Sequence, residues 1–306
     1  MTKVFLVILN WNGYKDTLEC LGSVSKVKPD NYDLHVVIVD NASTDNSVNY
    51  VKNFKSDNFE FSILTNKKNI GFAAGNNVGI KYSLEKGADY VMILNNDTII
   101  DKNLISGLLR TFREDPEVGV VSPKIYFAPG FEFHKKVYQS KDLGKVIWYA
   151  GGDMNWRNIY GTNHGVDEVD RRQFEKTIAT DFVTGACAFF NAEALKDIGF
   201  FDEKYFLYLE DADISQRMRK GGWKVLYSPH GFLWHKVAQS SAIGSELNDY
   251  FITRNRILFG LKYAPLRTRG ALVRESIKLL VNGRKWQKIG IKDYYLGKFY
   301  QGSWRN

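Results

Sequence analysis

The chain has 306 residues, 44% of them hydrophobic and 25% charged, which is enough apolar sequence for one large domain or one domain with an appendage. The apolar run Val4 to Leu9 is far shorter than the roughly 20 residues that cross a bilayer, so we expect a strand there rather than a membrane span or a signal peptide. Only two cysteines are present, Cys20 and Cys187, which excludes a disulfide scaffold and fits a reducing cytoplasm.

The net charge of +8 is concentrated at one end of the chain. The segment from Arg254 to Asn306 holds 13 Lys and Arg against two acidic residues, a net charge of +11, which leaves residues 1 to 253 with a net charge of −3. The basic character therefore belongs to a C-terminal extension.

The first part of the chain alternates apolar runs with helical stretches. Four runs rich in Val, Ile, Leu and aromatic residues predict buried strands: Val4 to Leu9, Leu34 to Val39, Phe61 to Leu64 and Tyr90 to Leu94. Between them we expect helices in a stretch after Cys20, at Thr44 to Phe54, and at Ala74 to Lys86, where Gly87 marks the end. Strands that alternate with helices predict a parallel sheet flanked by helices.

The second part is less regular. A helix at Leu104 to Phe112, ended by Asp115-Pro116, precedes a fifth strand at Val118 to Ser122. Periodicity fades between Ala128 and Thr180, which indicates irregular loops or short hairpins. The later expected elements are a regular stretch at Phe182 to Asn191, helices at Ala192 to Asp197 and Asp211 to Lys220, a strand at Trp223 to Tyr227, and amphipathic helices at Glu246 to Tyr263 and Ala271 to Val281.

Three of the predicted strands end in unusually polar segments. These are Asn10-Trp11-Asn12, the run Asp40 to Asp45, and Asn95-Asn96-Asp97-Thr98. Each alone is typical of a turn or a helix cap. Because ligands of open parallel sheets bind beyond the carboxyl ends of the strands, the three together favour a ligand site.

Individual residues of these ends suggest roles. Asp40 closes an apolar strand, where its carboxylate can accept hydrogen bonds from a base N–H or a ribose hydroxyl, and Trp11 can pack on a base. Asp97 comes to the same edge, and one or two carboxylates suffice for a divalent cation whose other ligands come from a diphosphate. The segment Asn69 to Gly79 combines glycines with amide side chains at a helix entrance, where backbone N–H groups are free for a polar ligand.

A second group of acids begins a predicted helix. Glu210, Asp211 and Asp213 precede Arg217 by seven, six and four residues, a pattern also typical of helix-dipole complementarity with an exposed ion pair. The apolar approach Phe206 to Leu209 favours a partly buried carboxylate that acts as a base. A histidine after an apolar stretch, His235, is either structural or completes a metal site with Asp97.

In order, these segments resemble the family 2 inverting glycosyltransferases of the GT-A fold, especially the rhamnosyltransferase-like branch. Five blocks carry the resemblance over about residues 1 to 260: Val7 to Gly13, Val39 to Asp45, Asn69 to Gly79, Leu94 to Thr98, and Gly185 through Asp213. The resemblance implies a Rossmann-like, mostly parallel sheet flanked by helices. It also implies a catalytic domain at 1–245, with a nucleotide-sugar half at 1–125 and an acceptor half at 126–245, and a helical basic extension at 246–306.

The resemblance also implies site residues and a cofactor. Asp211 corresponds to the general base, with Glu210 beside it, and Asp97 and His235 to ligands of Mn²⁺ or Mg²⁺. Asn95 stands where the family's metal motif has its first acid. The residues expected to bind the nucleotide sugar are Asn10, Trp11, Asp40, Asn69, Gly71, Gly75, Asn76, Asn96 and Arg254.

The expected reaction is direct, inverting displacement of a UDP or dTDP leaving group by a hydroxyl of a glycan or lipid-linked acceptor, in cell-surface polysaccharide synthesis. Residues 127 to 171 either shape the acceptor side or form a surface insertion. Two rival functions are a sugar-nucleotide pyrophosphorylase, which would want a glycine-rich loop with a basic residue after the first strand, and a catalytically silent scaffold subunit that keeps the nucleotide site.

The basic extension has several interpretations. Nucleic-acid binding would require a recognisable motif, and none is present. Aromatic residues interleaved with Lys and Arg favour docking on an anionic membrane surface, at the cytoplasmic face. A solvated helical face and a homodimer interface through the same helices are the alternatives. In the helix Ala271 to Val281, we expect Val273, Ile277, Leu280 and Val281 to share one apolar face.

Overall fold

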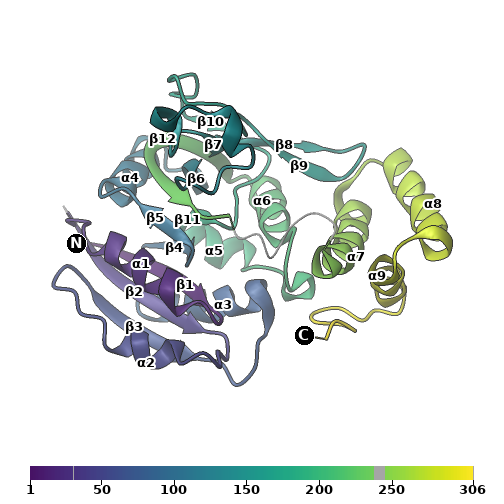
Figure 1. Ribbon diagram of the computed structural model, residues 1–306, viewed down its shortest axis with the longest axis horizontal. Helices are drawn as coiled ribbons and strands as arrows, with labels where there is room; N and C mark the ends of the chain where they lie inside the picture. The colour runs from purple at the N-terminus through teal and green to yellow at the C-terminus, as the bar shows by residue number, and fades with distance from the viewer. Residues whose placement is uncertain (30, 238–244, 306) are drawn as a thin grey trace.

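The computed structural model in Figure 1 describes residues 1–29, 31–237 and 245–305. Ten strands of the described chain form one sheet: β1 (Thr2–Asn10), β2 (Tyr32–Asp40), β3 (Glu60–Thr65), β4 (Tyr90–Asn95), β5 (Thr98–Ile100), β6 (Val118–Phe127), β7 (Ile147–Tyr149), β10 (Ile178–Ala179), β11 (Cys187–Asn191) and β12 (Lys224–His235). A separate hairpin consists of β8 (Gly152–Asn155) and β9 (Tyr160–Asn163).

The helices lie between and after these strands. They are α1 (Tyr14–Val24), α2 (Ser47–Lys52), α3 (Gly71–Glu85), α4 (Leu104–Glu114), α5 (Ala192–Ile198), α6 (Glu210–Lys220), α7 (Glu246–Tyr263), α8 (Leu266–Asn282) and α9 (Lys285–Tyr295). None of the helices in the described segments is long and apolar enough to cross a membrane.

Strand order explains where the polar strand ends meet. The sheet runs β10-β12-β6-β11-β4-β1-β2-β3, with β5 on β12 and β7 on β6. Strands β3, β2, β1 and β4 are parallel neighbours, as predicted, so their carboxyl ends share one edge. Strand β11 is antiparallel to β4 and brings the second half of the chain against that edge.

Two helical layers cover the sheet because side chains alternate along each strand. On β1, Leu6 and Ile8 pack in one core with residues of α1 and α4, while Phe5 and Val7 pack in a second core with residues of α3, α5 and α6. Helix α3 approaches β1 closely: a Cβ on Gly79 would lie 2.3 Å from Cγ1 of Val7. Glycine at this position therefore serves helix–sheet packing.

The structure departs from the sequence prediction in several elements. Strand β12 continues to His235, beyond the predicted Trp223 to Tyr227, because the chain bulges between Ser228 and Phe232 around Pro229 and then rejoins β6. The first helix begins at Tyr14, directly after the Asn12-Gly13 turn, so its predicted start after Cys20 is wrong. The segments β5 and α9 were not predicted.

Helix α7 packs on the rest of the chain, and α8 and α9 pack on α7 (Figure 1). The ring of Trp156, in the β8–β9 hairpin, stacks on Phe259 of α7 with centroids 5.9 Å apart. Nε of Arg256 donates to the carbonyl of Asn158 in the same hairpin at 2.7 Å. Helix α7 is thus attached to the β8–β9 hairpin, and the predicted domain boundary at residue 245 and the division into two halves stay predictions.

Candidate active site

The ends of β1 and β2 are joined by hydrogen bonds between side chains. Asn10 and Asp40 are opposite each other in the register, and Nδ2 of Asn10 donates to Oδ1 of Asp40 at 2.9 Å. The backbone N–H of Ser43 donates to Oδ2 of Asp40 at 3.0 Å, and Asn10 also donates to the Ser43 hydroxyl at 3.0 Å. Asp40 is therefore fixed in place, only 4% exposed at the sheet edge.

The network continues to the end of β4. The Thr17 hydroxyl donates to Oδ1 of Asn10 at 2.8 Å, and Nδ2 of Asn96 donates to that hydroxyl at 3.1 Å. The structure thus links three of the predicted site residues, Asp40, Asn10 and Asn96, through Thr17. The sequence analysis missed Thr17 and Ser43, although both stand close to the polar strand ends. Trp11 is 44% exposed beside this network.

The loop before α3 is organised by Asn41. Its Nδ2 donates to Oδ1 of Asn69 at 2.9 Å and to the carbonyl of Gly71 at 3.1 Å, while its Oδ1 accepts from the N–H of Ile70 at 3.1 Å. Asn69 also accepts from the N–H of Gly71 at 2.9 Å. Two of the predicted donor-binding residues, Asn69 and Gly71, therefore shape this loop.

Two further predicted donor-binding residues lie inside the protein. Nδ2 of Asn76 donates to the carbonyl of Phe72 at 3.0 Å, and Asn76 is 1% exposed. A Cβ on Gly75 would lie 2.6 Å from Cδ1 of Leu9, so this glycine faces β1. Because neither is open to solvent, the structure gives them packing roles, and their predicted contact with a nucleotide stays untested.

Asp97 and His235 lie side by side. Nε2 of His235 is 3.1 Å from Oδ1 of Asp97, and their side chains are 8% and 16% exposed. Their backbones are fixed by the pairing of His235 with Thr98 and by a 2.9 Å hydrogen bond from the N–H of Lys236 to the carbonyl of Asp97. Residues far apart in the sequence thus form a carboxylate–imidazole pair at the end of β4.

This pair suits a cation. Oδ1 of Asp97, the atom that faces Nε2 of His235, forms no hydrogen bond of good geometry among the described residues. Adjacent ligands of one ion, each about 2.1 Å from it, stand about 3 Å apart, which matches the Asp97–His235 separation. The described residues contain no group of three or more such ligands, so further ligands would come from the substrate.

The charge state of Asp97 is also suitable. Burial raises the pKa of Asp97, but the adjacent His235 imidazole and the cationic Lys236 outweigh burial, so its pKa lies below the ordinary value. Nζ of Lys236 in turn contacts Asp16 at 2.7 Å and Glu19 at 2.6 Å. Asp97 is therefore an ionised carboxylate at neutral pH.

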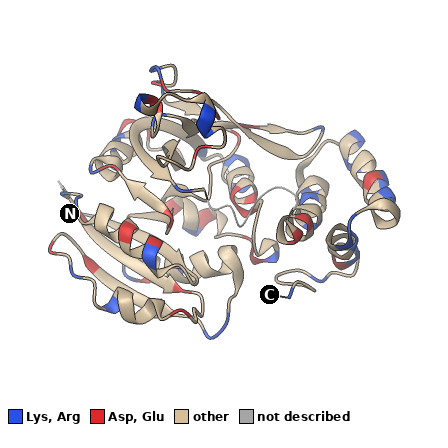
Figure 2. Ribbon diagram, in the orientation of Figure 1, with Lys and Arg blue, Asp and Glu red and all other residues tan. Residues whose placement is uncertain are grey.

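Two adjacent carboxyl groups begin α6 (Figure 2). Oδ2 of Asp211 accepts from the N–H of Gly185 at 3.0 Å, and its Oδ1 accepts from the N–H of Ala212 at 2.8 Å. Burial raises the pKa of Asp211, although these N–H groups oppose the shift. The pKa of Glu210 is raised well above its ordinary value by burial and then by the charge of Asp211. Oε2 of Glu210 is buried and has no hydrogen-bond partner in the described part of the chain.

The two parts of the site meet at the residues just before β11. Gly185, which binds Asp211, precedes Ala186, whose carbonyl accepts from the N–H of Asn95 at 3.0 Å. Asn95 is two residues before Asp97. The chain therefore brings the predicted base and the carboxylate–imidazole pair to neighbouring positions.

The third acid of α6 has a structural role. Asp213 is fully buried, and its carboxylate contacts Nε of Arg217 at 2.8 Å, Nζ of Lys262 at 2.6 Å and the Tyr263 hydroxyl at 2.8 Å. The ion pair with Arg217, within α6, is therefore buried at the acid, and the contacts with Lys262 and Tyr263 anchor α7 to α6. These cations hold the pKa of Asp213 below its ordinary value despite burial.

Arg254 lies away from solvent. It is 0% exposed, and its guanidinium donates to the carbonyls of Lys204 at 3.1 Å, Tyr205 at 2.9 Å and Tyr300 at 2.6 Å. In this arrangement the guanidinium faces carbonyl groups, so the structure does not bring it to the strand ends. Its predicted contact with donor phosphates stays untested.

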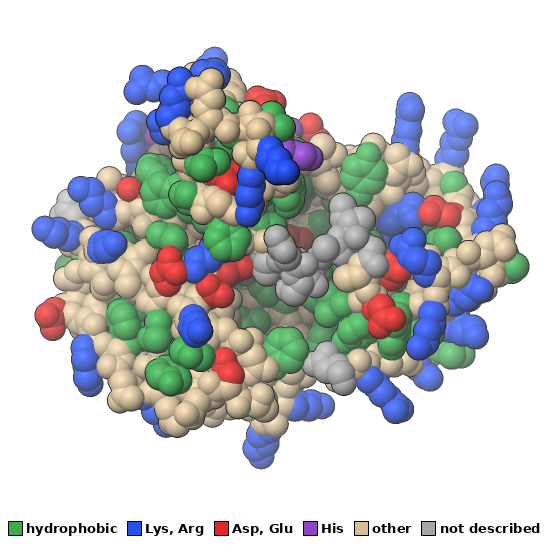
Figure 3. Space-filling view, in the orientation of Figure 1, with side chains coloured by type: hydrophobic (Ala, Val, Ile, Leu, Met, Phe, Trp, Pro, Cys, Tyr) green, Lys and Arg blue, Asp and Glu red, His purple; other side chains and the backbone are tan. Residues whose placement is uncertain are grey.

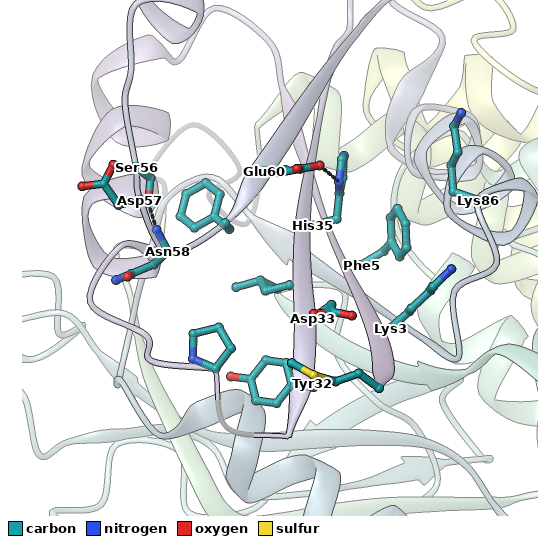
Figure 4. Close-up of a pocket in the computed structure, with 14 residues that line it drawn as sticks. Lys3, Phe5, Tyr32, Asp33, His35, Ser56, Asp57, Asn58, Glu60 and Lys86 are labelled. Carbon is teal, nitrogen blue, oxygen red and sulfur yellow. Dashed lines mark hydrogen bonds and ion pairs between the residues drawn. The ribbon is translucent and has the colours of Figure 1, made fainter.

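A separate hollow of about 670 Å³ lies at the opposite edge of the sheet (Figure 4). It is lined by residues near the starts of β1, β2 and β3, including Lys3, Asp33, His35 and Glu60. Its charges are mixed, and none of the residues predicted for the site lines it. We therefore assign the candidate site to the carboxyl ends of the strands.

Comparison with known proteins decides the family. Residues 5–199, more than half of the chain, match the sequence profile described as Glycosyl transferase family 2. The chain belongs to glycosyl transferase family 2. Among curated proteins, the glycosyltransferase is 25% identical over 207 residues to poly-beta-1,6-N-acetyl-D-glucosamine synthases of Staphylococcus aureus and Staphylococcus epidermidis. The match covers 67% of this chain and 43% of those synthases, so it spans less than half of their length.

Solved structures show the same fold. GalNAc-T7 with UDP, GalNAc and Mn²⁺ has a TM-score of 0.60 and 17% identity, covering 92% of this chain and 56% of that one. TarS 1-349 of S. aureus in complex with UDP-GlcNAc has a TM-score of 0.58 and 16% identity, covering 98% and 81%. Mannosyltransferase PcManGT from Pyrobaculum calidifontis, with GDP-Man and Mn²⁺, has a TM-score of 0.56 and 15% identity, covering 96% and 74%.

These comparisons confirm the GT-A fold and the family of the glycosyltransferase. They do not identify the rhamnosyltransferase-like branch, which stays a prediction.

Proposed function

We propose that this glycosyltransferase transfers one sugar, with inversion at the anomeric carbon, from a UDP or dTDP donor to a glycan or lipid-linked acceptor in cell-surface polysaccharide synthesis. The observation that carries the proposal is the placement of Asp211, a carboxylate of raised pKa, beside the segment that holds the Asp97–His235 pair. The polysaccharide synthases among the relatives support the substrate class.

Asp40 is proposed to recognise the base. Each of its oxygens accepts one hydrogen bond from the protein, from Asn10 and from Ser43. A carboxylate offers about four acceptor positions, so capacity remains for the N–H of a uracil or thymine ring. Trp11, exposed beside it, offers a flat apolar surface against which the base can pack.

Asp97 and His235 are proposed to hold the divalent cation of the donor complex. When bound, such a cation stabilises charge on the diphosphate leaving group as a Lewis acid. Mg²⁺ prefers an all-oxygen shell, whereas an imidazole ligand is better tolerated by a transition metal, so the pair favours Mn²⁺ over Mg²⁺. Asn95, in place of the family's first acid, adds no charge to the site.

Asp211 is proposed to take the proton from the acceptor hydroxyl as that oxygen attacks the anomeric carbon. A base works best when its pKa lies near the working pH, and burial moves Asp211 in that direction. Two backbone N–H groups stabilise the ionised form of Asp211, whereas Oε2 of Glu210 has no hydrogen-bond partner among the described residues, so the proposal places the shared proton on Glu210. A single in-line step gives inversion.

Residues 127 to 171 are proposed to shape the acceptor side. The indole of Trp148 packs against the His235 imidazole, with ring centroids 4.8 Å apart. This places an aromatic side chain of that segment next to the proposed cation ligand. Aromatic faces suit the apolar C–H faces of sugar rings.

A catalytically silent scaffold subunit is the alternative, and one substitution separates the two. Asp211→Asn keeps the size of the side chain and removes its basicity, so we expect kcat to fall about 100- to 10,000-fold. Binding of UDP or dTDP is expected to be unchanged, because Asp211 does not contact the proposed base site. Asp57→Asn, at an exposed position on the opposite sheet edge, is the control. A scaffold would show no turnover to lose.

The basic extension is proposed to dock on an anionic membrane surface at the cytoplasmic face. Helix α8 packs against the protein through Leu272 and Ser276, its two buried residues. The apolar face predicted from the sequence points elsewhere, because Ile277 is 57% and Val281 68% exposed. Lys and Arg side chains project around this end of the molecule (Figure 3). Exposed apolar side chains beside Arg274 and Lys278 match a layer of anionic lipid headgroups.

A further inference from the structure

The loop before α6 has an unusual backbone. Phe206, Tyr208 and Leu209 have φ angles of 65°, 71° and 70°, in the left-handed region that residues with a Cβ rarely adopt. Such a conformation persists only where surrounding contacts impose it. Leu209 is the N-cap of α6, so this loop sets the position from which Glu210 and Asp211 project.

Asn255 of α7 imposes the conformation from one side. Its Nδ2 donates to the carbonyls of Tyr205 at 2.8 Å, Leu207 at 2.7 Å and Tyr208 at 3.0 Å. Asn255 is 0% exposed. One buried amide therefore binds three backbone carbonyls of the loop and shares its two N–H hydrogens among them.

Arg254 extends this clamp. Its Nη2 binds the carbonyls of Lys204 and Tyr205, and its Nε donates to Oδ1 of Asn255 at 3.0 Å, which orients the Asn255 amide. Its Nη1 donates to the carbonyl of Tyr300, in the segment after α9. The guanidinium thus joins the loop, α7 and the C-terminal segment.

The opposite side of the loop rests on α3. The carbonyl of Phe206 accepts from the N–H of Phe72 at 2.6 Å and of Ala73 at 3.3 Å. The Phe206 ring stacks on Phe251 of α7, with centroids 5.1 Å apart and planes 7° apart. A Cβ on Gly71 would lie 2.5 Å from the Phe206 ring, so only glycine allows this contact. The loop is therefore fixed between the nucleotide half and α7.

We propose that Arg254 and Asn255 are positioning residues for the transfer reaction: they hold the loop 205–209 in the left-handed conformation that aims Asp211 at the acceptor. This inference rests on the proposed role of Asp211 as the base. It assigns α7 to the catalytic machinery rather than to a separable extension. Both side chains bind backbone carbonyl groups of the protein, so their proposed effect reaches the reaction through the geometry of Asp211.

The test compares Asn255→Asp with Arg284→Ala, a control variant that loses a different contact of α7. Asn255→Asp keeps the side-chain shape but faces the three carbonyls with oxygen instead of N–H. Arg284→Ala is the control, because it removes the ion pair of Arg284 with Asp249, which joins α9 to α7 without touching the loop. Unfolding midpoints are measured for both variants. Binding of UDP and of dTDP in the presence of Mn²⁺ is measured by calorimetry. Turnover is measured with the UDP or dTDP sugar that the wild type consumes.

We expect kcat of Asn255→Asp to fall about 100-fold, the effect of a displacement near 1 Å at a reacting group, with nucleotide binding unchanged. Arg284→Ala is expected to lower the unfolding midpoint and leave kcat at the wild-type value. If Asn255→Asp does not fold, Arg254→Lys, which keeps the cation and loses the forked donors, decides the same comparison.

Two results would overturn the inference. One is a wild-type kcat in a folded Asn255→Asp or Arg254→Lys variant, and the other is an equal fall of kcat in Arg284→Ala, which would show that any loosening of these helices suffices. A wild-type protein without turnover on any nucleotide sugar would instead contradict the proposed function.

Discussion

The backbone N–H of Gly185 donates a hydrogen bond to Oδ2 of Asp211 at 3.0 Å. Gly185 precedes β11, the antiparallel strand that lies between β4 and β6. The hydrogen bond therefore ties the proposed base to the same part of the sheet from which Asp97 projects. A carboxylate held by one backbone N–H on each oxygen keeps lone pairs free for a substrate proton.

The Glu210 carboxyl makes stability depend on pH. Its pKa is raised in the folded protein, so as pH rises the unfolded chain loses this proton before the folded chain does. The free energy of unfolding of the wild type therefore decreases as pH rises above about 4.3, the ordinary pKa of a glutamate in an unfolded chain. In Glu210→Gln the side chain does not titrate, so this decrease in the free energy of unfolding is absent. We expect the free energy of unfolding of the variant, relative to the wild type, to increase between about pH 5 and about pH 8 in urea titrations.

Glu85→Gln, which removes an exposed carboxyl on α3, controls for the Glu-to-Gln exchange itself. A difference between Glu210→Gln and wild type that stayed constant across this pH range would show that Glu210 is ionised without penalty, contrary to its burial.

Two helical glycines are expected to respond to alanine in opposite directions. A Cβ on Gly79 would lie 2.3 Å from a buried Val7 methyl, so Gly79→Ala should lower the free energy of unfolding by about 1–3 kcal/mol. Nothing lies within 4 Å of a Cβ on Gly22 in α1, so Gly22→Ala should raise it by about 0.5–1 kcal/mol through helix propensity. Urea unfolding of both variants measures this, and a stabilised Gly79→Ala would refute the close approach of α3 to β1.

Charge reversal on α8 tests the membrane proposal. Each Lys or Arg near an anionic surface contributes about 1 kcal/mol, so the double variant Arg274→Glu, Lys278→Glu should bind phosphatidylserine-containing vesicles at least about 30-fold more weakly. Lys52→Glu with Lys55→Glu, at the end of the distant α2 and just after it, is the matched control (Figure 1). Cosedimentation with vesicles of phosphatidylcholine alone and with phosphatidylserine measures both.

Equal binding of the α8 and α2 variants would contradict membrane docking through α8. A concentration-dependent dimer in ultracentrifugation that Ile277→Asp dissociates would assign this face to a homodimer instead.

The predictable part of the site was the part encoded locally. An apolar strand followed at once by Asp or Asn is visible in the sequence, so Asp40, Asp97 and the polar end at Asn10 could be placed on one edge. Asp97 and His235, which the family resemblance paired, are adjacent because β5 and β12 pair, and β5 is too short to be seen as a strand. The sequence alone contains no periodic signal for that contact.

The remainder depended on long-range packing. The glycines of α3 look the same whether they face a ligand or a strand, and only the structure shows Gly75 against Leu9. Arg254 has the charge of a phosphate ligand, but the carbonyls that enclose it come from residues 204, 205 and 300, far away in the sequence. Neighbouring Asn255 has no sequence feature that marks it as a clamp.

The most direct test of the account is slow hydrolysis of a panel of nucleotide sugars, with and without Mn²⁺ or Mg²⁺, by the wild type and by Asp97→Ala. We predict that a UDP or dTDP sugar is hydrolysed, that chelation of the metal stops the reaction, and that Asp97→Ala abolishes it while Asp57→Ala, at the opposite edge, does not. If no nucleotide sugar were bound under any condition, the assignment of Asp40 and Asp97 to a donor site would be wrong; if one were bound but never hydrolysed, the scaffold role would replace catalysis.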